Sequence, residues 1–367
     1  MCTVLYDYQA FAMQHIGGVS RYFAELAAHV GQEEGIEARV PVRFSDNLYA
    51  QEILGIKRRP GFYRYRTHGA RFLHALTDQL NQRALISALT TADNPIIHPT
   101  YYHPYVLSIR KPHRLVVTVY DMIHELFPDD LPDPVTVQRK KRLMDAADVI
   151  IAISHSTKSD IARLYPELES KTTVIHLAGS LEPNHIEATP LTTNPSVLFV
   201  GSRTVYKNFR ILARSFAQIA PEFPGLELVC VGGGAFTRDE QTLLQALTIH
   251  DRCRQVTVSD SDLAQLYTQA TLFVFPSLYE GFGLPVLEAM ACGAPCLLSN
   301  TSSLPEVGGD AACYFDPDDG EALADTLAQL LADKAARDQM RNAGSLRAQQ
   351  FSWEKSAQQH GEVYRAL

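Results

Sequence analysis

The sequence lacks any apolar run long enough to cross a membrane. A transmembrane helix needs about 18–20 consecutive apolar residues, and the longest runs here, such as 149–153, have only the length of a β-strand. Residues 3–6 already read as a strand, and no basic region followed by an apolar one precedes them, as a secretion signal would require. We therefore expect a cytoplasmic protein, or one bound peripherally to the inner face of a membrane.

Cysteine pairs and a basic excess are also missing. The six cysteines among 367 residues show neither disulfide-scaffold density nor the Cys-x-x-Cys spacing of zinc sites, so buried thiols are expected. The chain has 33 Lys and Arg against 41 Asp and Glu, a net charge of -8, which argues against nucleic acid as the main partner. The 46% content of hydrophobic residues excludes a disordered chain.

The charge is divided unevenly along the chain. Residues 1–180 carry 20 Lys and Arg against 19 Asp and Glu, whereas residues 181–367 carry 13 against 22. A polar stretch at about 179–195 separates the halves and is typical of a linker. We expect two domains, at 1–180 and 190–350, with a C-terminal helix at about 353–367 that packs back on the first domain.

Strand-like apolar runs alternate with helical patterns through both halves. Most of these runs are predominantly apolar and do not alternate between polar and apolar residues, which is typical of strands buried on both faces of a parallel sheet. The fold class is therefore α/β, with two Rossmann-like doubly wound parallel sheets facing a central cleft; a single eight-fold barrel fits less well because the linker interrupts the rhythm. The predicted strands are 3–6, 38–42, 96–98, 114–120, 148–153, 172–177, 196–200, 226–231, 255–258, 271–275, 295–298 and 312–315.

The densest motif spans residues 275–290. A buried strand ends at Phe275, a glycine-bearing loop follows, and Pro285 stands where a first helical residue would. The free N–H groups and the positive dipole end of such a helix start suit a phosphate. Glu280 and Glu288 flank this helix start, and carboxylates accept hydrogen bonds from sugar and ribose hydroxyls. Either glutamate alone is explained by an exposed loop or helix turn; the whole constellation favours a ligand site.

This block resembles the Glu-x7-Glu signature of the retaining glycosyltransferases of family 4, which adopt the GT-B fold. The resemblance continues through 288–295 and 302–307 and covers essentially the whole chain. It implies a nucleotide diphosphate sugar as donor. By resemblance, Glu280 holds the hydroxyls of the transferred sugar and Glu288 those of the ribose. The remaining donor-binding residues of this loop are Gly281, Phe282, Gly283 and Leu284.

A second motif, at 200–208, places two cations beside a strand-to-helix loop. Arg203 and Lys207 suit the neutralisation of a diphosphate. In the family, an Arg and a Lys at this place hold the diphosphate and stabilise it as it leaves, so both are also candidate catalytic residues. Arg203 stands one position later than the commonest placement, with Ser202 in the usual slot.

Two further motifs lie in the first half. Gly17 and Gly18 open a helix, and the family has a Gly-Gly loop there that faces the donor diphosphate. Asp121 follows a buried strand and is a candidate catalytic or positioning residue. Many family members have a histidine before this Asp; Tyr120 replaces it here, so Tyr120 or His124 is a candidate for the sugar contact. His98 ends another strand and is a further candidate for acceptor or sugar contact, with a structural role equally open.

No cofactor or metal is expected. The three glycines at 232–234 lack the Gly-x-Gly-x-x-Gly spacing of a dinucleotide site. The aspartates at 316, 318 and 319 are typical of a turn and a helix cap, and Ser154 of a helix cap. The family is similar in needing no obligatory divalent ion.

A basic segment in the first half suggests an anionic partner. No acidic residue lies between Glu52 and Asp78, and aromatic residues interleave with the cations. An anionic membrane surface or a lipid-diphosphate-linked acceptor would suit such a segment. The residues proposed to contact it are Lys57, Arg58, Arg59, Arg64 and Arg66.

The expected activity is therefore transfer of a hexose from a nucleotide diphosphate sugar to a glycan or lipid-linked acceptor, with retention at the anomeric carbon, in polysaccharide synthesis. UDP-glucose or a similar UDP-hexose is favoured as donor, and GDP-mannose is the alternative. Two other classes stay open: a sugar-nucleotide epimerase on the same fold, and a non-catalytic binding subunit.

Overall fold

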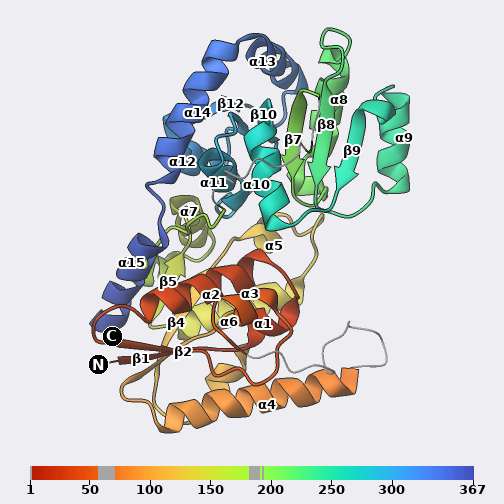
Figure 1. Cartoon of the computed structure of the whole chain (residues 1–367). Coiled ribbons are helices and arrows are strands. Elements are labelled where there is room, and N and C mark those ends of the chain that lie inside the picture. Colours follow the sequence, from red (N-terminus) through yellow and green to blue (C-terminus); the bar gives the residue numbers. More distant parts are fainter. Residues whose placement is uncertain (1, 57–70, 182–190, 192–193) are drawn as a thin grey trace. The chain divides into compact units, whose positions relative to one another are not determined.

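A computed structural model describes residues 2–56, 71–181, 191 and 194–367, with the side chains of 71–74 left out (Figure 1). The chain forms two compact units. Unit 1 comprises 1–177 and 353–367, and unit 2 comprises 178–352. The predicted basic residues Lys57, Arg58, Arg59, Arg64 and Arg66 lie outside the described residues.

Unit 1 is built on a six-stranded parallel sheet of order β2-β1-β3-β4-β5-β6. Its strands are β1 (Cys2–Tyr6), β2 (Ile36–Arg39), β3 (Pro95–His98), β4 (Arg114–Val119), β5 (Val149–Ala152) and β6 (Thr172–Val174). Its helices are α1 (Gln9–Met13), α2 (Gly18–Val30), α3 (Leu48–Glu52), α4 (Arg71–Thr90), α5 (Ile123–Leu126), α6 (Pro134–Ala146), α7 (His155–Leu164) and α15 (Trp353–Ala366), with 3-10 turns η1 (Pro104–Ser108) and η2 (Pro166–Lys171).

Unit 2 repeats this plan with the order β12-β11-β10-β7-β8-β9. Its strands are β7 (Ser196–Val200), β8 (Glu227–Val231), β9 (Cys253–Val256), β10 (Leu272–Phe275), β11 (Cys296–Ser299) and β12 (Cys313–Phe315). Its helices are α8 (Phe209–Ile219), α9 (Arg238–Ala246), α10 (Asp260–Gln269), α11 (Leu284–Ala291), α12 (Leu304–Gly308), α13 (Gly320–Ala332) and α14 (Lys334–Ala348), with 3-10 turns η3 (Val205–Lys207), η4 (His250–Arg252) and η5 (Gly309–Ala311).

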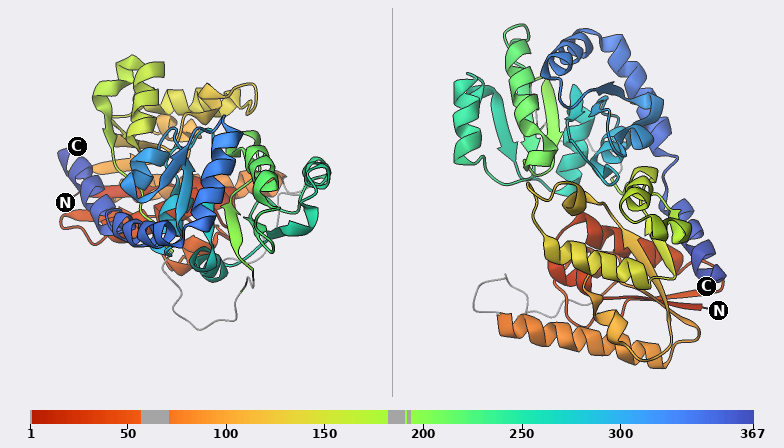
Figure 2. Two further views of the ribbon diagram at one scale, coloured as in Figure 1. Left: turned by 90° about the horizontal axis from the view of Figure 1, so that it is seen from above. Right: turned by 180° about the vertical axis from the view of Figure 1, so that it is seen from behind.

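The structure confirms the predicted α/β class, and every predicted strand is present, with boundaries moved by at most three residues. Helices cover both faces of each sheet (Figures 1 and 2) because neighbouring strand residues point to opposite sides. In unit 1, Val117 packs in the core that α4, α6 and α7 cover, whereas the hydroxyl of Thr118 contacts Tyr22 on α2 and His98 on β3. In unit 2, Phe199 packs in the core beneath α8 and α13.

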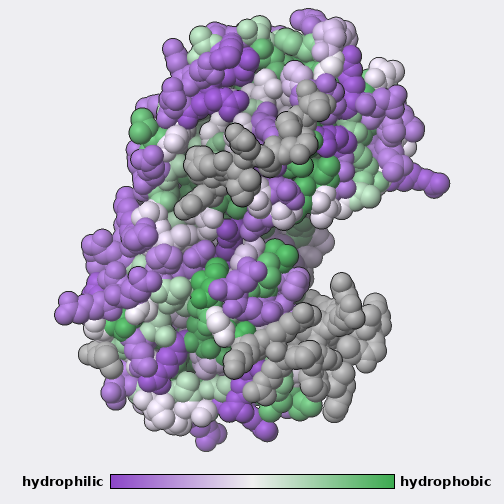
Figure 3. Space-filling view, in the orientation of Figure 1, coloured by the Kyte–Doolittle hydropathy of each residue, from purple (hydrophilic) through white to green (hydrophobic). Residues whose placement is uncertain are grey.

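The surface helices follow the same logic. Of the fifteen residues of α14, only Gly344 is buried, and hydrophilic side chains cover its outward face (Figure 3). The caps predicted from sequence are present: Ser154 accepts a hydrogen bond from the Thr157 N–H at 2.9 Å, and Asp319 caps α13 through the Ala322 N–H at 2.9 Å. Within the described chain, no helix combines the length and apolar character that spanning a membrane requires.

Helix α15 joins unit 1 through a buried polar network. The hydroxyl of Tyr364 lies 3.0 Å from that of Tyr6 and 2.7 Å from Nδ1 of His98. One turn earlier, Nε2 of His360 lies 3.0 Å from the hydroxyl of Tyr22 on α2. Four of these five side chains are completely buried, and the fifth, Tyr22, is nearly so. Because unpaired buried polar groups are costly, the network fixes α15 to the sheet and to α2.

Burial has a clear electrostatic consequence for the two histidines. It lowers the pKa of His360 from 6.5 to about 4, and it also lowers that of His98, with the nearby His360 adding to the effect. The folded state therefore binds fewer protons than the unfolded chain between about pH 6.5 and pH 4, so its stability falls as the pH falls through this window.

We predict that unit 1 loses about 2 kcal/mol of unfolding free energy between pH 7 and pH 5 through His360 alone. The chain has one tryptophan, Trp353 on α15, whose ring packs near those of Tyr22 and His29, so urea unfolding followed by its fluorescence reports on this helix. His360→Gln should weaken the pH dependence, and His250→Gln, on exposed η4, should leave it unchanged. An unaltered pH dependence in His360→Gln would contradict the prediction.

Candidate functional site

The strand order of unit 2 locates a ligand crevice. In open parallel sheets, ligands bind at the carboxyl ends of the strands, where the order of the strands reverses. In unit 2 this point lies between β7 and β10, which pair directly. The loops that follow these strands, 201–208 and 276–283, carry both densest motifs of the sequence.

The structure brings two of the predicted residues together at this point. The ammonium of Lys207, at the end of η3, lies 2.6 Å from Oε1 of Glu280, which follows β10. Each side chain is only 12% exposed. The ammonium also lies 4.9 Å from the ring centroid of Phe275 and 5.2 Å from that of Tyr206. A cation and a carboxylate thus stand side by side, held in place and shielded from water.

Backbone bonds fix these two loops. The Leu278 N–H donates to the Tyr206 carbonyl at 2.7 Å, which joins the loop after β10 to that after β7. Asn208 adopts the left-handed region at φ 55°, where its side-chain amide donates to the Pro317 carbonyl at 2.8 Å. The position of Lys207 therefore follows from a turn that is stabilised by bonds to the segments after β10 and β12.

Two serines that the sequence analysis noted only as part of the family signature hold the Glu280 loop. The hydroxyl of Ser302 accepts from the Glu280 N–H at 2.9 Å. The hydroxyl of Ser303 lies 2.9 Å from the carbonyl of Glu280 and 2.8 Å from that of Phe282, to which it donates. Nothing in their spacing indicates this role, because it depends on the return of the chain after β11.

The start of α11 has the predicted character. No side chain caps it, and Gly283 precedes it at φ 105°. A Cβ on Gly283 would lie 3.0 Å from the Leu304 side chain, so the close approach of α12 also requires glycine here. Pro285 is the second rather than the first helical residue. Glu288 lies on α11 near the buried Tyr267, whose pKa is raised by burial and further by the charge of Glu288.

Arg203 takes a different direction from the one expected. Its side chain is 2% exposed, and its Nε donates to Oε1 of Glu240 at 2.9 Å. Its terminal nitrogens donate to carbonyls of the glycine turn that follows β8, at 2.8 Å to Gly232 and 2.8 Å to Gly234. The guanidinium is therefore bound within the protein, in contrast to the sequence-based expectation of a group facing the diphosphate.

In unit 1, the predicted Gly-Gly loop is held by a network of side-chain hydrogen bonds. Gly18 begins α2, and Gly17 before it is extended, with φ 179°. The hydroxyl of Ser20 donates to the Gly17 carbonyl at 2.9 Å and accepts from the Asn47 side chain at 2.9 Å. Asn47 also donates to the Gln14 carbonyl at 2.9 Å, so it ties this loop to the one before α3.

The segment after β4 carries Tyr120, Asp121 and His124. The Tyr120 hydroxyl donates to the Thr100 carbonyl at 2.9 Å, and Asp121 accepts from the Ile123 N–H at 3.1 Å, which starts α5. Nδ1 of His124 lies 3.0 Å from the Leu131 carbonyl. Since a carbonyl only accepts, Nδ1 carries the proton, and in the neutral ring Nε2 keeps its lone pair.

A buried ion pair supports this segment. The ammonium of Lys140, on α6, donates to Oε2 of Glu125 and to the backbone carbonyl of Asp121, both at 2.8 Å. The two charged side chains are 1% and 4% exposed. Since a buried charge without its partner is strongly destabilising, this pair fixes the backbone at Asp121. The sequence showed Lys140 only as one member of a basic run.

The structure corrects the candidate role of His98 in ligand contact. This residue is completely buried, and its Nε2 lies 2.8 Å from the Thr118 hydroxyl while its Nδ1 faces Tyr364. Both ring nitrogens are thus used inside the core of unit 1. A different residue, Asp7, holds the loops after β1 and β3 together, and no sequence motif marked it. Its Oδ1 accepts hydrogen bonds from the N–H and the hydroxyl of Thr100, at 2.8 and 2.7 Å.

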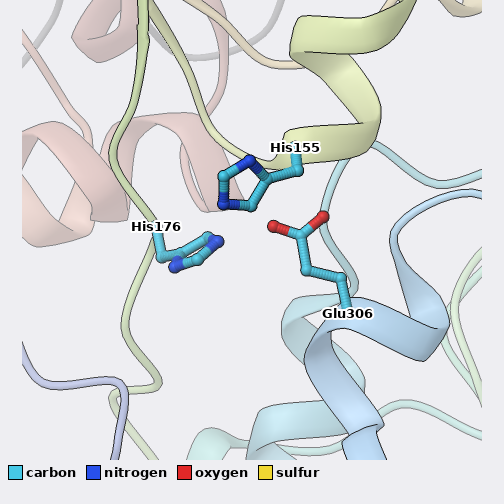
Figure 4. A group of neighbouring side chains, drawn as sticks. All are labelled: His155, His176 and Glu306. Atoms are coloured by element: carbon cyan, nitrogen blue, oxygen red, sulfur yellow. The ribbon is translucent and has the colours of Figure 1, made fainter.

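Two further histidines stand near the carboxyl ends of strands in unit 1. His155 begins α7 after β5, and His176 follows β6; their ring centroids lie 5.7 Å apart in an edge-to-face arrangement (Figure 4). No motif marked either of them, because they are 21 residues apart and only the pairing of β5 with β6 brings them together.

Comparisons with known proteins agree with this architecture. Residues 16–178 match the family described as Glycosyltransferase Family 4, and residues 182–347 match that described as Glycosyl transferases group 1. O-antigen chain mannosyltransferase B of Escherichia coli is 32% identical over 305 residues, which cover 78% of each chain. Among solved structures, sucrose-phosphate synthase from Thermosynechococcus elongatus superposes with a TM-score of 0.76 at 22% identity, over 99% of this chain and 98% of the other.

A second solved structure, HepE from Anabaena in complex with UDP and glucose, also has a TM-score of 0.76, at 17% identity over 100% of both chains. These structural likenesses show the fold, and the matches to both halves together with the identity to the Escherichia coli enzyme show the family. The chain belongs to the family 4 glycosyltransferases, enzymes of the GT-B fold.

Proposed function

We propose that the protein transfers a hexose from a nucleotide diphosphate sugar to a hydroxyl of a glycan or lipid-diphosphate-linked acceptor, with retention at the anomeric carbon. The observation that carries this proposal is the contact of Lys207 with Glu280 at the point where the strand order of unit 2 reverses. One cation suits a diphosphate, and one carboxylate suits sugar hydroxyls, at adjacent positions. The acceptor would bind to unit 1.

Donor binding would exchange the partners of this pair. The diphosphate oxygens would take the ammonium of Lys207, and the carboxylate of Glu280 would then accept hydrogen bonds from the sugar. The uncapped start of α11 would add backbone N–H donors and its dipole. As the bond between the anomeric carbon and the phosphate oxygen breaks, negative charge grows on the phosphate, and these groups would stabilise it without a bound metal.

The remaining steps need little further chemistry from the protein. The acceptor oxygen would bond to the anomeric carbon on the face that the phosphate leaves, and its proton would pass to the departing phosphate. Asp121 would position the reacting groups, supported by Lys140 beneath its backbone. Glu288 would hold the ribose hydroxyls. In this scheme the atoms balance with a nucleoside diphosphate and a glycosidic bond as products.

For the sugar, we favour mannose carried by GDP over UDP-glucose, the first choice of the sequence analysis. The relative of 32% identity bears the name of a mannosyltransferase. The UDP and glucose named with the Anabaena structure belong to a protein of 17% identity, whose likeness extends to the fold alone. The acceptor that suits this reading is a growing polysaccharide.

We predict that Lys207→Ala and Glu280→Gln each lower kcat/KM by about 100-fold or more, because each removes a charge that acts on the transition state. Radiolabelled sugar transfer to an acceptor extract measures this, with circular dichroism to confirm folding. Lys334→Ala is the matched control, since Lys334 forms an exposed ion pair with Asp338 on α14. Activity within twofold of the native protein in either site variant would refute the assignment.

A thermal-shift screen against UDP, GDP, ADP and their sugars should single out GDP and GDP-mannose. A ligand at 100 times its Kd stabilises the native state by about 2.7 kcal/mol, which such a screen detects. Stabilisation by UDP-glucose but not by GDP-mannose would overturn the choice of donor. Product analysis by NMR without acceptor then separates the transferase from an epimerase, which would change the sugar while it is still attached to its nucleotide.

The basic segment that contains Arg58, Arg59 and Arg64 leads to a separate proposal, attachment to an anionic membrane surface, which rests on the sequence alone. Sedimentation with anionic vesicles should exceed that with neutral vesicles, and should fall when these three arginines are changed to glutamine. Equal sedimentation with both kinds of vesicle would exclude the proposal.

A further inference from the structure

We propose that Arg203 is a positioning residue that holds the glycine turn after β8 in its conformation, and that it does not bind the donor diphosphate. This inference rests on the proposed function, since it concerns how the same donor is held. In this scheme Lys207 and the start of α11 bind the diphosphate. Arg203 instead holds the conformation of the neighbouring glycine turn, defined here as residues 232–235.

The hydrogen bonds of the guanidinium carry the inference. Besides Glu240 and the carbonyls of Gly232 and Gly234, a terminal nitrogen donates to the Ala235 carbonyl at 3.1 Å. The guanidinium carbon also lies 4.9 Å from the ring centroid of Phe236. An arginine has five N–H groups. Four of them donate here, one to a carboxylate and three to the turn, and the side chain is only 2% exposed. No pair of N–H groups is therefore left to bind a phosphate through two hydrogen bonds.

The turn needs such a clamp because of its backbone. Gly232, Gly233 and Gly234 all have positive φ, at 87°, 69° and 71°. Three consecutive glycines lose much conformational entropy when they are fixed, and a run of this kind brings carbonyl oxygens together. One guanidinium that donates hydrogen bonds to three of those oxygens offsets both costs.

The same geometry sets what the turn presents to a ligand. In a trans peptide the N–H points opposite to the C=O. The carbonyls of Gly232, Gly234 and Ala235 face Arg203, so the N–H groups of Gly233, Ala235 and Phe236 point away from it. The turn follows β8, which pairs with β7 on the side away from β10. It is therefore the next loop along the sheet edge from Lys207, where the nucleoside half of a donor would extend.

Helix α9 anchors the clamp. Thr237 and Glu240 form a capping box at its start, in which Oε2 of Glu240 accepts from the Thr237 N–H at 2.7 Å. The other carboxylate oxygen, Oε1, accepts from Arg203 at 2.9 Å. Glu240 thus joins the helix, the arginine and the turn. This gives a structural reason for the position of the arginine, which stands one residue later than is common in the family. Ser202 occupies the common position, and Arg203 reaches the glycine turn.

Amide ¹⁵N relaxation tests the clamp without any ligand. The order parameters of the amides of 233–236 should lie near those of a rigid backbone, about 0.85, in the native protein and fall below about 0.6 in Arg203→Gln and in Glu240→Ala. Thr237→Ala is the matched control, because it weakens the cap of α9 but leaves the pair of Glu240 with Arg203. Unchanged order parameters in Arg203→Gln would overturn the proposal. If Arg203→Gln does not fold, Arg203→Lys serves, since it keeps the charge but not the fork.

Ligand binding tests the consequence for the donor, with GDP and guanosine as probes in ligand-detected NMR titrations. We expect Arg203→Gln and Arg203→Lys to weaken both probes by the same factor, about tenfold, and Lys207→Ala to weaken GDP alone. The exposed Arg238, changed to Gln, should alter neither.

A loss confined to GDP in Arg203→Gln, with recovery in Arg203→Lys, would show a direct phosphate contact and refute the proposal, as would native affinity for both probes. If the native protein binds neither UDP, GDP nor ADP, the proposed function fails, while the relaxation result still decides whether Arg203 holds the turn.

Discussion

Lys207 and Glu280 are 73 positions apart in the sequence and 2.6 Å apart in the fold. Only the direct pairing of β7 with β10 brings them together, because two parallel strands that lie side by side deliver their following loops to the same edge. Several neighbouring contacts hold this pair in place. Asn208 turns the chain after Lys207, and Ser302 and Ser303 hold the loop that carries Glu280. Two aromatic rings shield the ammonium. The ion pair satisfies both charges within the protein, so neither needs an outside partner for the fold to be stable.

A second feature of the structure is that its buried polar side chains form connected hydrogen-bond networks. Lys140 and Glu125 form one such set beneath Asp121. A second set joins α15 to α2 and the sheet and consists of Tyr6, Tyr22, His98, Thr118, His360 and Tyr364. An apolar core tolerates small shifts, whereas a hydrogen bond fails beyond a few tenths of an ångström. These sets therefore fix the register between elements where packing alone would leave it loose.

The sequence predicted the central strands well because a parallel strand buried on both faces is apolar throughout, and the short length of these runs between helical patterns distinguishes them from buried helices. It also located Lys207, Glu280 and the start of α11, since these depend on local motifs at strand ends. It failed where a side chain chooses among distant partners. Nothing near Arg203 in the sequence indicates Glu240 or the glycine turn, and nothing near His98 indicates Tyr364. Such residues are typical ligand-binding types, and only the packed structure shows that their hydrogen-bonding capacity is already used.

The placement of α15 has a consequence for how the chain reaches its native state. Unit 2 is continuous from 178 to 352, whereas unit 1 is completed by residues that the ribosome makes after all of unit 2. Until α15 emerges, Tyr6, Tyr22 and His98 lack the partners that bury with them. These buried polar contacts of unit 1 can therefore form only after the whole of unit 2 has been translated. A chain truncated before 353 would leave the hydroxyls of Tyr6 and Tyr22 and the ring of His98 without their partners on α15. Unit 1 would then open locally and become sensitive to proteolysis.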